Sequence, residues 1–223
     1  TESLIDGNRT NNGPGAGICS QSGTVSVVSS TLSRNWAHNN GGAICSSGGA
    51  LTVANSVLVG NATYYAGGGI YNQNADLVVT NSTIAGNSAR NLGGGIYSTD
   101  GSRQTTLYNS ILAGNVASSA PDVYVKLVTL SASHTLIANG EGQSTLVDGR
   151  DGNLIGTAEA PKYPGFVRDP SDGGDGFGDN PQTSGLDESA NDDYGDLRLR
   201  ADSAARDAGD DLLLPEDTYD LDA

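Results

Sequence analysis

The sequence is poor in the residues that build large apolar cores and most metal centres. Its 223 residues include no methionine, one tryptophan, two phenylalanines, two histidines and two cysteines. The cysteines, Cys19 and Cys45, form no CxxC pair, and the histidines, His38 and His134, form no cluster. These absences argue against a thiolate or imidazole metal site and against catalysis by a cysteine nucleophile. We also find no signal peptide and no run of apolar residues long enough to span a membrane.

Basic residues are scarce as well. There are 11 Lys and Arg against 26 Asp and Glu, so the formal net charge is −15. Residues 1–140 carry equal numbers of both signs, and residues 141–223 therefore hold the whole acidic excess. Proteins that bind nucleic acid need a basic surface, so we expect no nucleic-acid partner. The acidic part of the chain is compatible with cation binding, or simply with solubility.

Glycine, in contrast, is abundant, with 32 residues, and it recurs in a fixed phrase. The phrase Gly-Gly-(Ala or Gly)-Ile ends at Ile44, Ile70 and Ile96, and an imperfect copy, Gly-Ala-Gly-Ile, ends at Ile18. The isoleucines are 26 residues apart three times in succession. A fixed period of this length is the signature of a repeat architecture.

Each period also contains two short apolar patterns. The first alternates with period two, as a strand with one buried face does, and the second lies three residues before an asparagine. We therefore expect three short strands per coil, at Gly-Ile-Tyr, Leu-x-Val and Ser-x-Leu/Ile, separated by turns rich in Gly and Asn. The first pattern comprises Val25/Val27, Leu51/Val53, Leu77/Val79 and Thr105/Leu107, and the second comprises Leu32, Leu58, Ile84 and Leu112, which precede Asn35, Asn61, Asn87 and Asn115.

Strands this short cannot bury a face alone, but stacked coils can, because equivalent residues then form ladders about 4.8 Å apart. The sequence predicts an all-β fold, a right-handed parallel β-helix (solenoid) of about five to six coils over residues 1–158. Residues 159–223 would form an acidic, loop-rich extension packed on the solenoid or linked to it, with one more strand at Leu197 and Leu199 that could add to the sheet.

Alternation within the strands predicts which ladders face the core. Residues one apart in a strand point to opposite faces, so the isoleucines and the residue after each cannot both be inward. We expect Ile44, Ile70, Ile96, Val53, Val79, Leu58 and Ile84 to be buried, with Cys45, Tyr71 and Tyr97 on the opposite face.

The repeats resemble those of a known family. Gly-Gly-(Ala or Gly)-Ile followed by Leu/Ile-x-x-Asn is similar to the GGA[ILV] and FxxN repeats of chlamydial polymorphic outer-membrane proteins, although Leu or Ile stands here in place of Phe. Residues 152–156, 192–199 and 203–210 are similar to the end of secreted bacterial β-helix proteins of the choice-of-anchor Q type. The resemblance implies a β-helix fold and a secreted bacterial protein at an extracellular or cell-surface location. It implies little about activity, because the fold hosts adhesins, lyases and structural fibres alike.

Cys19 and Cys45 lie one period apart, at the same place in adjacent coils. Neighbouring strands bring their Cα atoms into bridging range, but directly stacked Cβ atoms tend to be farther apart than a disulfide prefers. The spacing fits either a disulfide between the coils or two stacked thiols, and the sequence leaves both open.

Three aromatic residues fall in equivalent turns. Trp36, Tyr64 and Tyr65 could line up along one edge as a strip for carbohydrate, or they could only cover the apolar edge of the turns. We expect His38 and His134 to be surface turn residues, since neither has a second histidine with which to act.

The acidic extension contains a candidate cation site. Hard oxygen ligands on flexible turns suit Ca²⁺, although the spacing here matches neither the EF-hand loop nor the glycine-rich nonapeptide repeats. A solvated acidic loop is the alternative interpretation. The candidate calcium ligands are Asp172, Asp175, Asp179, Asp187, Asp192 and Asp193.

Two classes of function fit the sequence. A non-enzymatic structural or adhesin-like surface module is favoured, because the outward positions of the coils are mostly Ser, Thr, Ala and Tyr, with Lys126 as the only lysine. The alternative is a polysaccharide-binding protein or polysaccharide lyase, which would need carboxylates for calcium and a basic proton acceptor on one outward face. We expect the chain to be a segment of a longer protein or fibre, which associates with other copies or other coils through the open ends of the solenoid.

Overall fold

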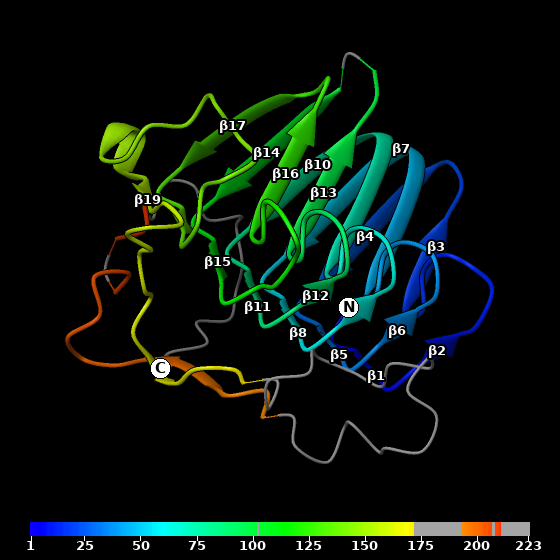
Figure 1. The fold of residues 1–223 in the computed structure, drawn as a ribbon, viewed down its shortest axis with the longest axis horizontal. Helices are drawn as coiled ribbons and strands as arrows, with labels where there is room; N and C mark the ends of the chain where they lie inside the picture. Colours follow the sequence, from blue (N-terminus) through cyan, green and yellow to red (C-terminus); the bar gives the residue numbers. More distant parts are fainter. Residues whose placement is uncertain (102, 172–192, 207, 211–223) are drawn as a thin grey trace.

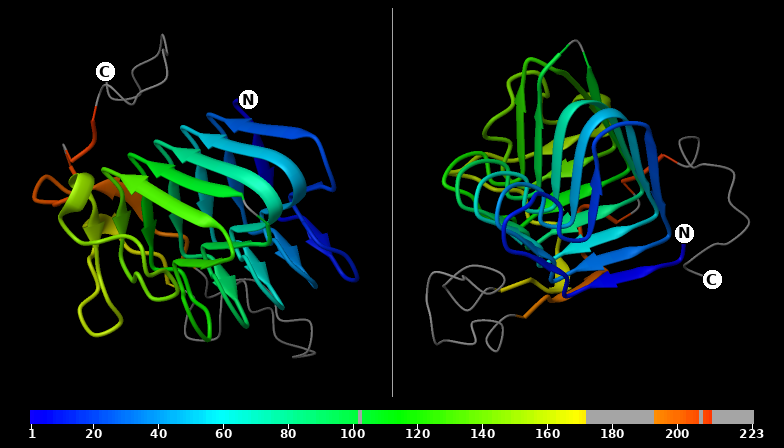
Figure 2. Two further views of the ribbon diagram at one scale, coloured as in Figure 1. Left: turned by 90° about the horizontal axis from the view of Figure 1, so that it is seen from above. Right: turned by 90° about the vertical axis from the view of Figure 1, so that its right-hand side faces the viewer.

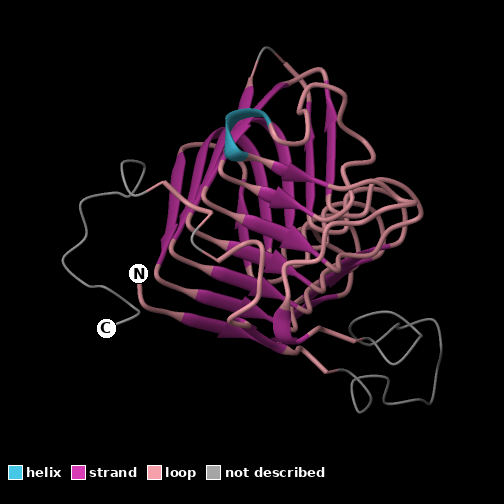
Figure 3. Cartoon of the chain, turned by 90° about the vertical axis from the view of Figure 1, so that its left-hand side faces the viewer, coloured by secondary structure: helices cyan, strands magenta, loops and turns pink. Residues whose placement is uncertain are grey.

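The computed structural model describes residues 1–101, 103–171, 193–206 and 208–210. Their regular structure is almost all β-strand, and the one helical element among them is the short 3-10 turn η1 (Arg150–Gly152) (Figure 3). The chain winds through stacked coils that superimpose when they are viewed along the solenoid (Figures 1 and 2). None of the described helical segments is long and apolar enough to cross a membrane.

The strands of the coils form three parallel sheets, which we name the broad, side and short sheets. The broad sheet consists of β3 (Ile18–Ser20), β4 (Thr24–Val28), β7 (Ile44–Ala54), β10 (Ile70–Thr80), β13 (Ile96–Thr99), β14 (Gln104–Tyr108), β16 (Val123–Lys126) and β17 (Thr129–Ser133). The side sheet consists of β1 (Leu4–Asp6), β5 (Thr31–Ser33), β8 (Val57–Val59), β11 (Thr83–Ala85), β15 (Ile111–Ala113), β18 (Leu136–Ile137) and β19 (Leu154–Ile155). The short sheet consists of β2 (Arg9–Thr10), β6 (Trp36–Ala37), β9 (Ala62–Thr63) and β12 (Ser88–Ala89).

The strand register confirms the 26-residue period. Ile70 pairs with Ile44 on one side and with Ile96 on the other, so the three isoleucines form one continuous ladder. All seven residues predicted to face the core are fully buried, namely Ile44, Ile70, Ile96, Val53, Val79, Leu58 and Ile84. The core is therefore a set of stacked apolar ladders, as the alternation predicts.

The outward ladder is also where the pattern predicts it, with one difference. Cys45 pairs with Cys19 and Tyr71 in the register, and each of the three directly follows an isoleucine of the inward ladder. Tyr71 and Tyr97 are half-buried, but Cys45 is only 3% exposed. A residue inside a ladder is covered by its neighbours in the coils above and below, so an outward position need not be an exposed one.

The prediction of three strands per coil was wrong in detail. In the second and third coils the first two expected strands merge into β7 and β10, which bend where Gly48, Gly49 and Asn74 adopt positive φ. A further strand appears where Asn35–Asn40 and its equivalents were expected to turn. Trp36 there pairs with Arg9 and Ala62, because stacking supplies each segment with a parallel partner in the next coil.

A column of asparagines runs through the interior beside the core. The side-chain amide of each asparagine donates to the side-chain oxygen of the next over 2.9 to 3.0 Å, from Asn8 through Asn35, Asn61 and Asn87 to Asn115. Each oxygen except the first also accepts the backbone N–H of the asparagine one coil earlier. The column satisfies buried polar groups that would otherwise destabilise a narrow core.

Asp122 ends this column. Its Oδ1 accepts from the side-chain amide of Asn115 over 2.7 Å, and its Oδ2 accepts from the backbone N–H of Asn139 over 2.7 Å. Burial raises the pKa of this carboxyl from its ordinary value of 3.8 to about 7, against the opposing effect of these donors. Asp122 is therefore a buried acid whose charge depends on pH near neutrality.

The C-terminal segment returns along the outside of the solenoid. β20 (Phe166–Arg168) and β21 (Asp196–Leu199) form an antiparallel pair, and Phe166, Leu197 and Leu199 pack against Ala85 and Ala113 on the outer face of the side sheet. The strand expected at Leu197 and Leu199 therefore exists but does not join the parallel sheet. The apolar face of this strand lies across small outward residues of the coils. That position buries more apolar surface of the strand than a place at the edge of the parallel sheet would.

Candidate functional site

One surface of the solenoid gathers aromatic and cationic side chains, and we call it the aromatic strip. It follows the short sheet and consists of Arg9, Trp36, His38, Tyr64, Tyr65 and Arg90. Backbone bonds between coils hold it in register: His38 donates to the carbonyl of Thr10, Tyr64 to that of Ala37, and Arg90 to that of Thr63. His38, Tyr64 and Arg90 are consequently stacked at 26-residue spacing.

The rings and guanidinium groups of the strip form two stacks. His38 and Tyr64 are parallel within 10°, with ring centroids 5.4 Å apart, and the Arg90 guanidinium lies 4.7 Å above the Tyr64 ring. Arg90 also donates to the hydroxyl of Tyr64. The Arg9 guanidinium lies 4.8 Å above the ring of Trp36. Contacts of a cation with an aromatic face hold these side chains in defined positions.

The rings of the strip differ in exposure, and Trp36 fits the alternative that an aromatic residue only covers the apolar edge of a turn. Trp36 is only 7% exposed, because it lies in β6 with its outer ring face covered by Arg9, so it supports the strip and offers no free ring. Tyr65 is 42% exposed and meets Tyr64 edge-on at 5.0 Å. Tyr65 is therefore the accessible aromatic ring, and His38 is half-buried beneath it.

The electrostatics of the strip oppose those of the whole chain. Arg90 is exposed, and no carboxylate of the described residues forms an ion pair with it. Asn91, beside Arg90, is exposed as well. An exposed ring next to a guanidinium and an amide can pack on an apolar face of a ligand while it binds an anionic group and hydroxyls.

A second aromatic column lies on the outer face of the broad sheet. Tyr71, Tyr97 and Tyr124 are stacked with centroids 5.2 and 5.1 Å apart. Burial raises the pKa of Tyr71 to about 12 and also raises the pKa of Tyr97. Because the rings cover one another's faces, this column stabilises the stacking of the coils and leaves mainly ring edges for a ligand.

The bend of β10 brings together carboxylates and a cation, as a lyase would require. Arg103 lies 3.4 Å from Asp76, and Gln73 donates to Asp100 over 2.7 Å. Arg103 also donates to Asn74 over 3.4 Å. The groups of this corner are thus partnered with one another, which leaves no unpaired base beside the two carboxylates among these residues.

Cys19 and Cys45 are free thiols. They are direct partners in the parallel pairing of β3 with β7, so the sequence placed them correctly. Cys19 is exposed and Cys45 is buried.

Most of the predicted calcium ligands, namely Asp172, Asp175, Asp179, Asp187 and Asp192, lie outside the described residues. Asp193 is described, and it forms an ion pair with Arg168 at 2.6 Å. Its Oδ1 also accepts the N–H of Gly195 over 2.9 Å. Within residues 1–101, 103–171, 193–206 and 208–210 no three His, Cys, Asp or Glu side chains gather into a group that could hold a metal. Calcium binding stays a prediction.

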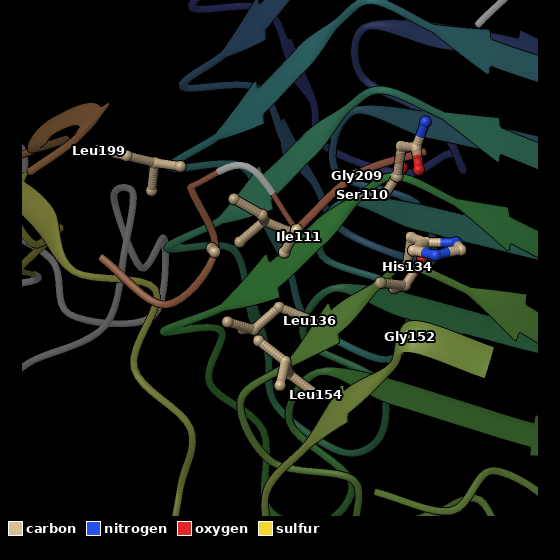
Figure 4. A pocket seen from close by; sticks show the side chains of 12 residues that line it. Ser110, Ile111, His134, Leu136, Gly152, Leu154, Leu199 and Gly209 are labelled. Atoms are coloured by element: carbon tan, nitrogen blue, oxygen red, sulfur yellow. The ribbon is translucent and has the colours of Figure 1, made fainter. Parts of the chain in front are cut away.

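A pocket of about 200 Å³ lies between the side sheet and the returning C-terminal segment (Figure 4). Ile111, Leu136, Leu154 and Leu199 line it, together with His134. The sequence predicted His134 as a surface turn residue, but it is half-buried, and its Nδ1 is buried without a hydrogen-bond partner among the described residues. His134 occupies the same turn position as Asn109 does one coil earlier. This equivalence is the feature of the sequence from which its position could have been predicted. Asn109, Ser110 and Thr135 also line the pocket, so its walls are partly polar.

Comparison with known proteins agrees with the observed coils. The family model described as right handed beta helix region matches residues 1–141, which is more than half of the chain. No curated protein and no solved structure matches the chain. With its parallel sheets, its 26-residue register and this match, the chain belongs to the right-handed beta helix family.

Proposed function

We propose that the chain is a non-enzymatic, adhesin-like module of the extracellular or cell surface that binds saccharide through the aromatic strip. The observation that carries the proposal is the exposed ring of Tyr65 beside a Tyr64 ring held between His38 and Arg90. A sugar ring has an apolar C–H face that packs on an aromatic ring and hydroxyls that need polar partners. Tyr65 offers the first, and the neighbouring Asn91 offers the second.

The charge of the strip favours an acidic saccharide. A guanidinium binds a carboxylate or sulfate through two parallel hydrogen bonds. The Arg90 guanidinium is held over the Tyr64 ring and is exposed, so it can meet such a group from solution. The acidic excess lies in residues 141–223, and that part of the chain would repel such a polymer, which supports binding on the coils.

End-to-end association is part of the same proposal. β1, β2 and β3 pair on only one side among the described strands, and Leu4 in β1 is 70% exposed. Unpaired strand edges recruit further strands. This edge would accept another coil of the same kind, from a second copy or from the same protein, and so build an extended fibre.

A polysaccharide lyase is the second candidate, and the corner formed by Asp76, Asp100 and Arg103 is the observation that favours it. Lyase activity would appear as breakdown of polygalacturonate in the presence of calcium. We expect no breakdown, because Arg103 is engaged with Asp76 and so is a poor proton acceptor.

Calorimetric titration with oligogalacturonate tests saccharide binding. Tyr65→Ala should weaken binding about two- to tenfold, the value of an aromatic contact of roughly 0.5–1.5 kcal/mol. Arg90→Gln should weaken binding of the acidic oligomer, but not of a neutral glucan.

Tyr163 and Arg150, both exposed and outside the strip, provide the matched controls. Tyr163→Ala and Arg150→Gln should leave the affinity unchanged. Equal losses in the strip variants and in these controls would reject the aromatic strip as the binding site.

A further inference from the structure

Cys19 and Cys45 form a pair of thiols at the junction of the first two coils. They are Cα partners in adjacent parallel strands, which lie about 4.8 Å apart, within the range of 4.4–6.8 Å that disulfides use. Disulfides prefer Cβ atoms about 3.8 Å apart, which is less than the strand spacing, so closing a bond between Cys19 and Cys45 requires rotation of both side chains and a small approach of β3 toward β7.

The two thiols differ in accessibility. Cys19 is exposed, whereas Cys45 is buried between Cys19 and Tyr71 in the outward ladder. An added Cβ at Gly15 would lie 2.7 Å from the Cβ of Cys19 and 3.0 Å from that of Cys45, so this turn covers both cysteines closely. Because Cys19 is the exposed thiol, a reagent in solution meets Cys19 before Cys45.

We propose that Cys19 and Cys45 are a redox pair that closes into a disulfide between the first and second coils, with Cys19 as the entry thiol and Cys45 as the resolving thiol. A low-molecular-weight disulfide such as oxidised glutathione is the oxidant. The pairing geometry and the unequal exposure carry the proposal independently of the saccharide-binding function.

The chemistry balances in two exchange steps. The Cys19 thiolate attacks the reagent disulfide, forms a mixed disulfide and releases one glutathione thiolate, which takes up a proton. The Cys45 thiol then gives up its proton and attacks the Cys19 sulfur, which releases the second glutathione. Two protein thiols are oxidised, and one disulfide is reduced to two thiols. Burial raises the pKa of Cys45 to about 12, so we expect the second step to be the slow one.

The consequence concerns the first coil, which lies at an edge of the described sheets. Ile5, Ile18 and Val25 are only partly buried, whereas their equivalents in later coils are fully buried. A disulfide there ties the edge coil to β7 and limits its local opening. Oxidation would thus stabilise the edge strands on which end-to-end association depends.

Treatment of the folded chain with oxidised glutathione, followed by intact mass measurement, tests the pair. The wild type should lose the mass of two hydrogen atoms and keep no adduct. Cys45→Ser should hold a persistent glutathione adduct on Cys19, and Cys19→Ser should stay unmodified until it is unfolded. A lasting adduct on the wild type, an unmodified wild type, or an unmodified Cys45→Ser would each overturn the proposal.

Native-state hydrogen exchange tests the effect on the first coil. The amide of Ile18 donates to the carbonyl of Ala43. In the oxidised chain this amide should exchange more slowly, by a factor of up to about ten, while the amide of Ile96 in the middle of the solenoid should exchange at an unchanged rate. Equal exchange of Ile18 in the reduced and oxidised chains would show that the disulfide does not restrain the coil.

Discussion

Asp122 links the interior of the solenoid to the pH of its surroundings. Each asparagine after Asn8 both accepts and donates, but Asp122 accepts N–H groups from Asn115 and Asn139 at its two oxygens. An ionised carboxylate suits these donors, whereas complete burial opposes the charge. The same column that orders the core therefore ends in a group whose protonation affects stability.

The free energy of unfolding should fall as the pH rises through neutrality. The folded-state pKa of Asp122, about 7, lies above its ordinary value of 3.8, so the folded chain holds this proton more tightly than the unfolded chain does. The contribution is fully present below pH 3.8 and is lost as the pH passes 7. Between pH 5 and pH 8 the wild type should lose roughly 2 kcal/mol relative to Asp122→Asn, whose side chain does not titrate.

Urea denaturation at several pH values measures this difference. The variant also loses the acceptor for the N–H of Asn139, so its stability is offset at every pH, and only the slope against pH is informative. Parallel curves for the wild type and Asp122→Asn would contradict a raised pKa.

At the level of the strands, β10 occupies the centre of the broad sheet. It pairs with β7 on one side and with β13 and β14 on the other, and its Ile70 is fully buried. Ile70→Ala should destabilise the fold by roughly 2–5 kcal/mol, because the ladder cannot collapse into the space that is left. Val147→Ala, at a position 52% exposed, is the control in the same denaturation experiment and should change little. A loss below about 1 kcal/mol at Ile70 would place this ladder outside a tightly packed core.

The C-terminal segment is held to the coils at defined places. Tyr194 lies over Gly60, where an added Cβ would come within 2.0 Å of its ring, and Asn109 exchanges two hydrogen bonds of 3.0 Å with the backbone of Asp210. Gly60→Ala should displace Tyr194 and increase trypsin cleavage at Arg198 several-fold.

Gly114→Ala is the matched control for this experiment. Gly114 has nearly the same φ as Gly60, +64° against +63°, but no atom lies near its added Cβ. Both variants carry the backbone cost of alanine in the left-handed region, so their difference isolates the contact with Tyr194. Equal cleavage of the two variants would mean that Tyr194 does not anchor the segment.

The sequence predicted the coils well because stacking repeats each inward residue at a fixed spacing. Ile44, Ile70 and Ile96 needed only the period and the alternation to be placed. The strand at Trp36 was missed because its partners, Arg9 and Ala62, come from other coils and leave no local pattern. The burial of Trp36 and the exposure of Tyr65 depend in the same way on which side chain lies one coil away. The sequence therefore named Trp36, Tyr64 and Tyr65 without showing which ring is free, and it did not place Arg9 and Arg90 beside them, because those contacts also form between coils.

As a whole, the molecule is a solenoid with two kinds of long surface. The side sheet is covered by the returning C-terminal segment, and the broad and short sheets carry the tyrosine column and the aromatic strip. Calcium, predicted for the acidic extension, would stabilise the native state by mass action. Addition of EDTA should then lower the melting temperature, and an unchanged melt would remove the calcium hypothesis.

Nuclear magnetic resonance with oligogalacturonate added to the isotope-labelled chain locates the saccharide on the surface. If the aromatic strip is the binding site, the ring signals of Tyr65 and the guanidinium signal of Arg90 should shift in proportion to occupancy, while those of Tyr97 and Arg103 should not. Shifts confined to Arg103, Asp76 and Asp100 would place the binding site at the corner of the broad sheet and reject saccharide binding at the aromatic strip.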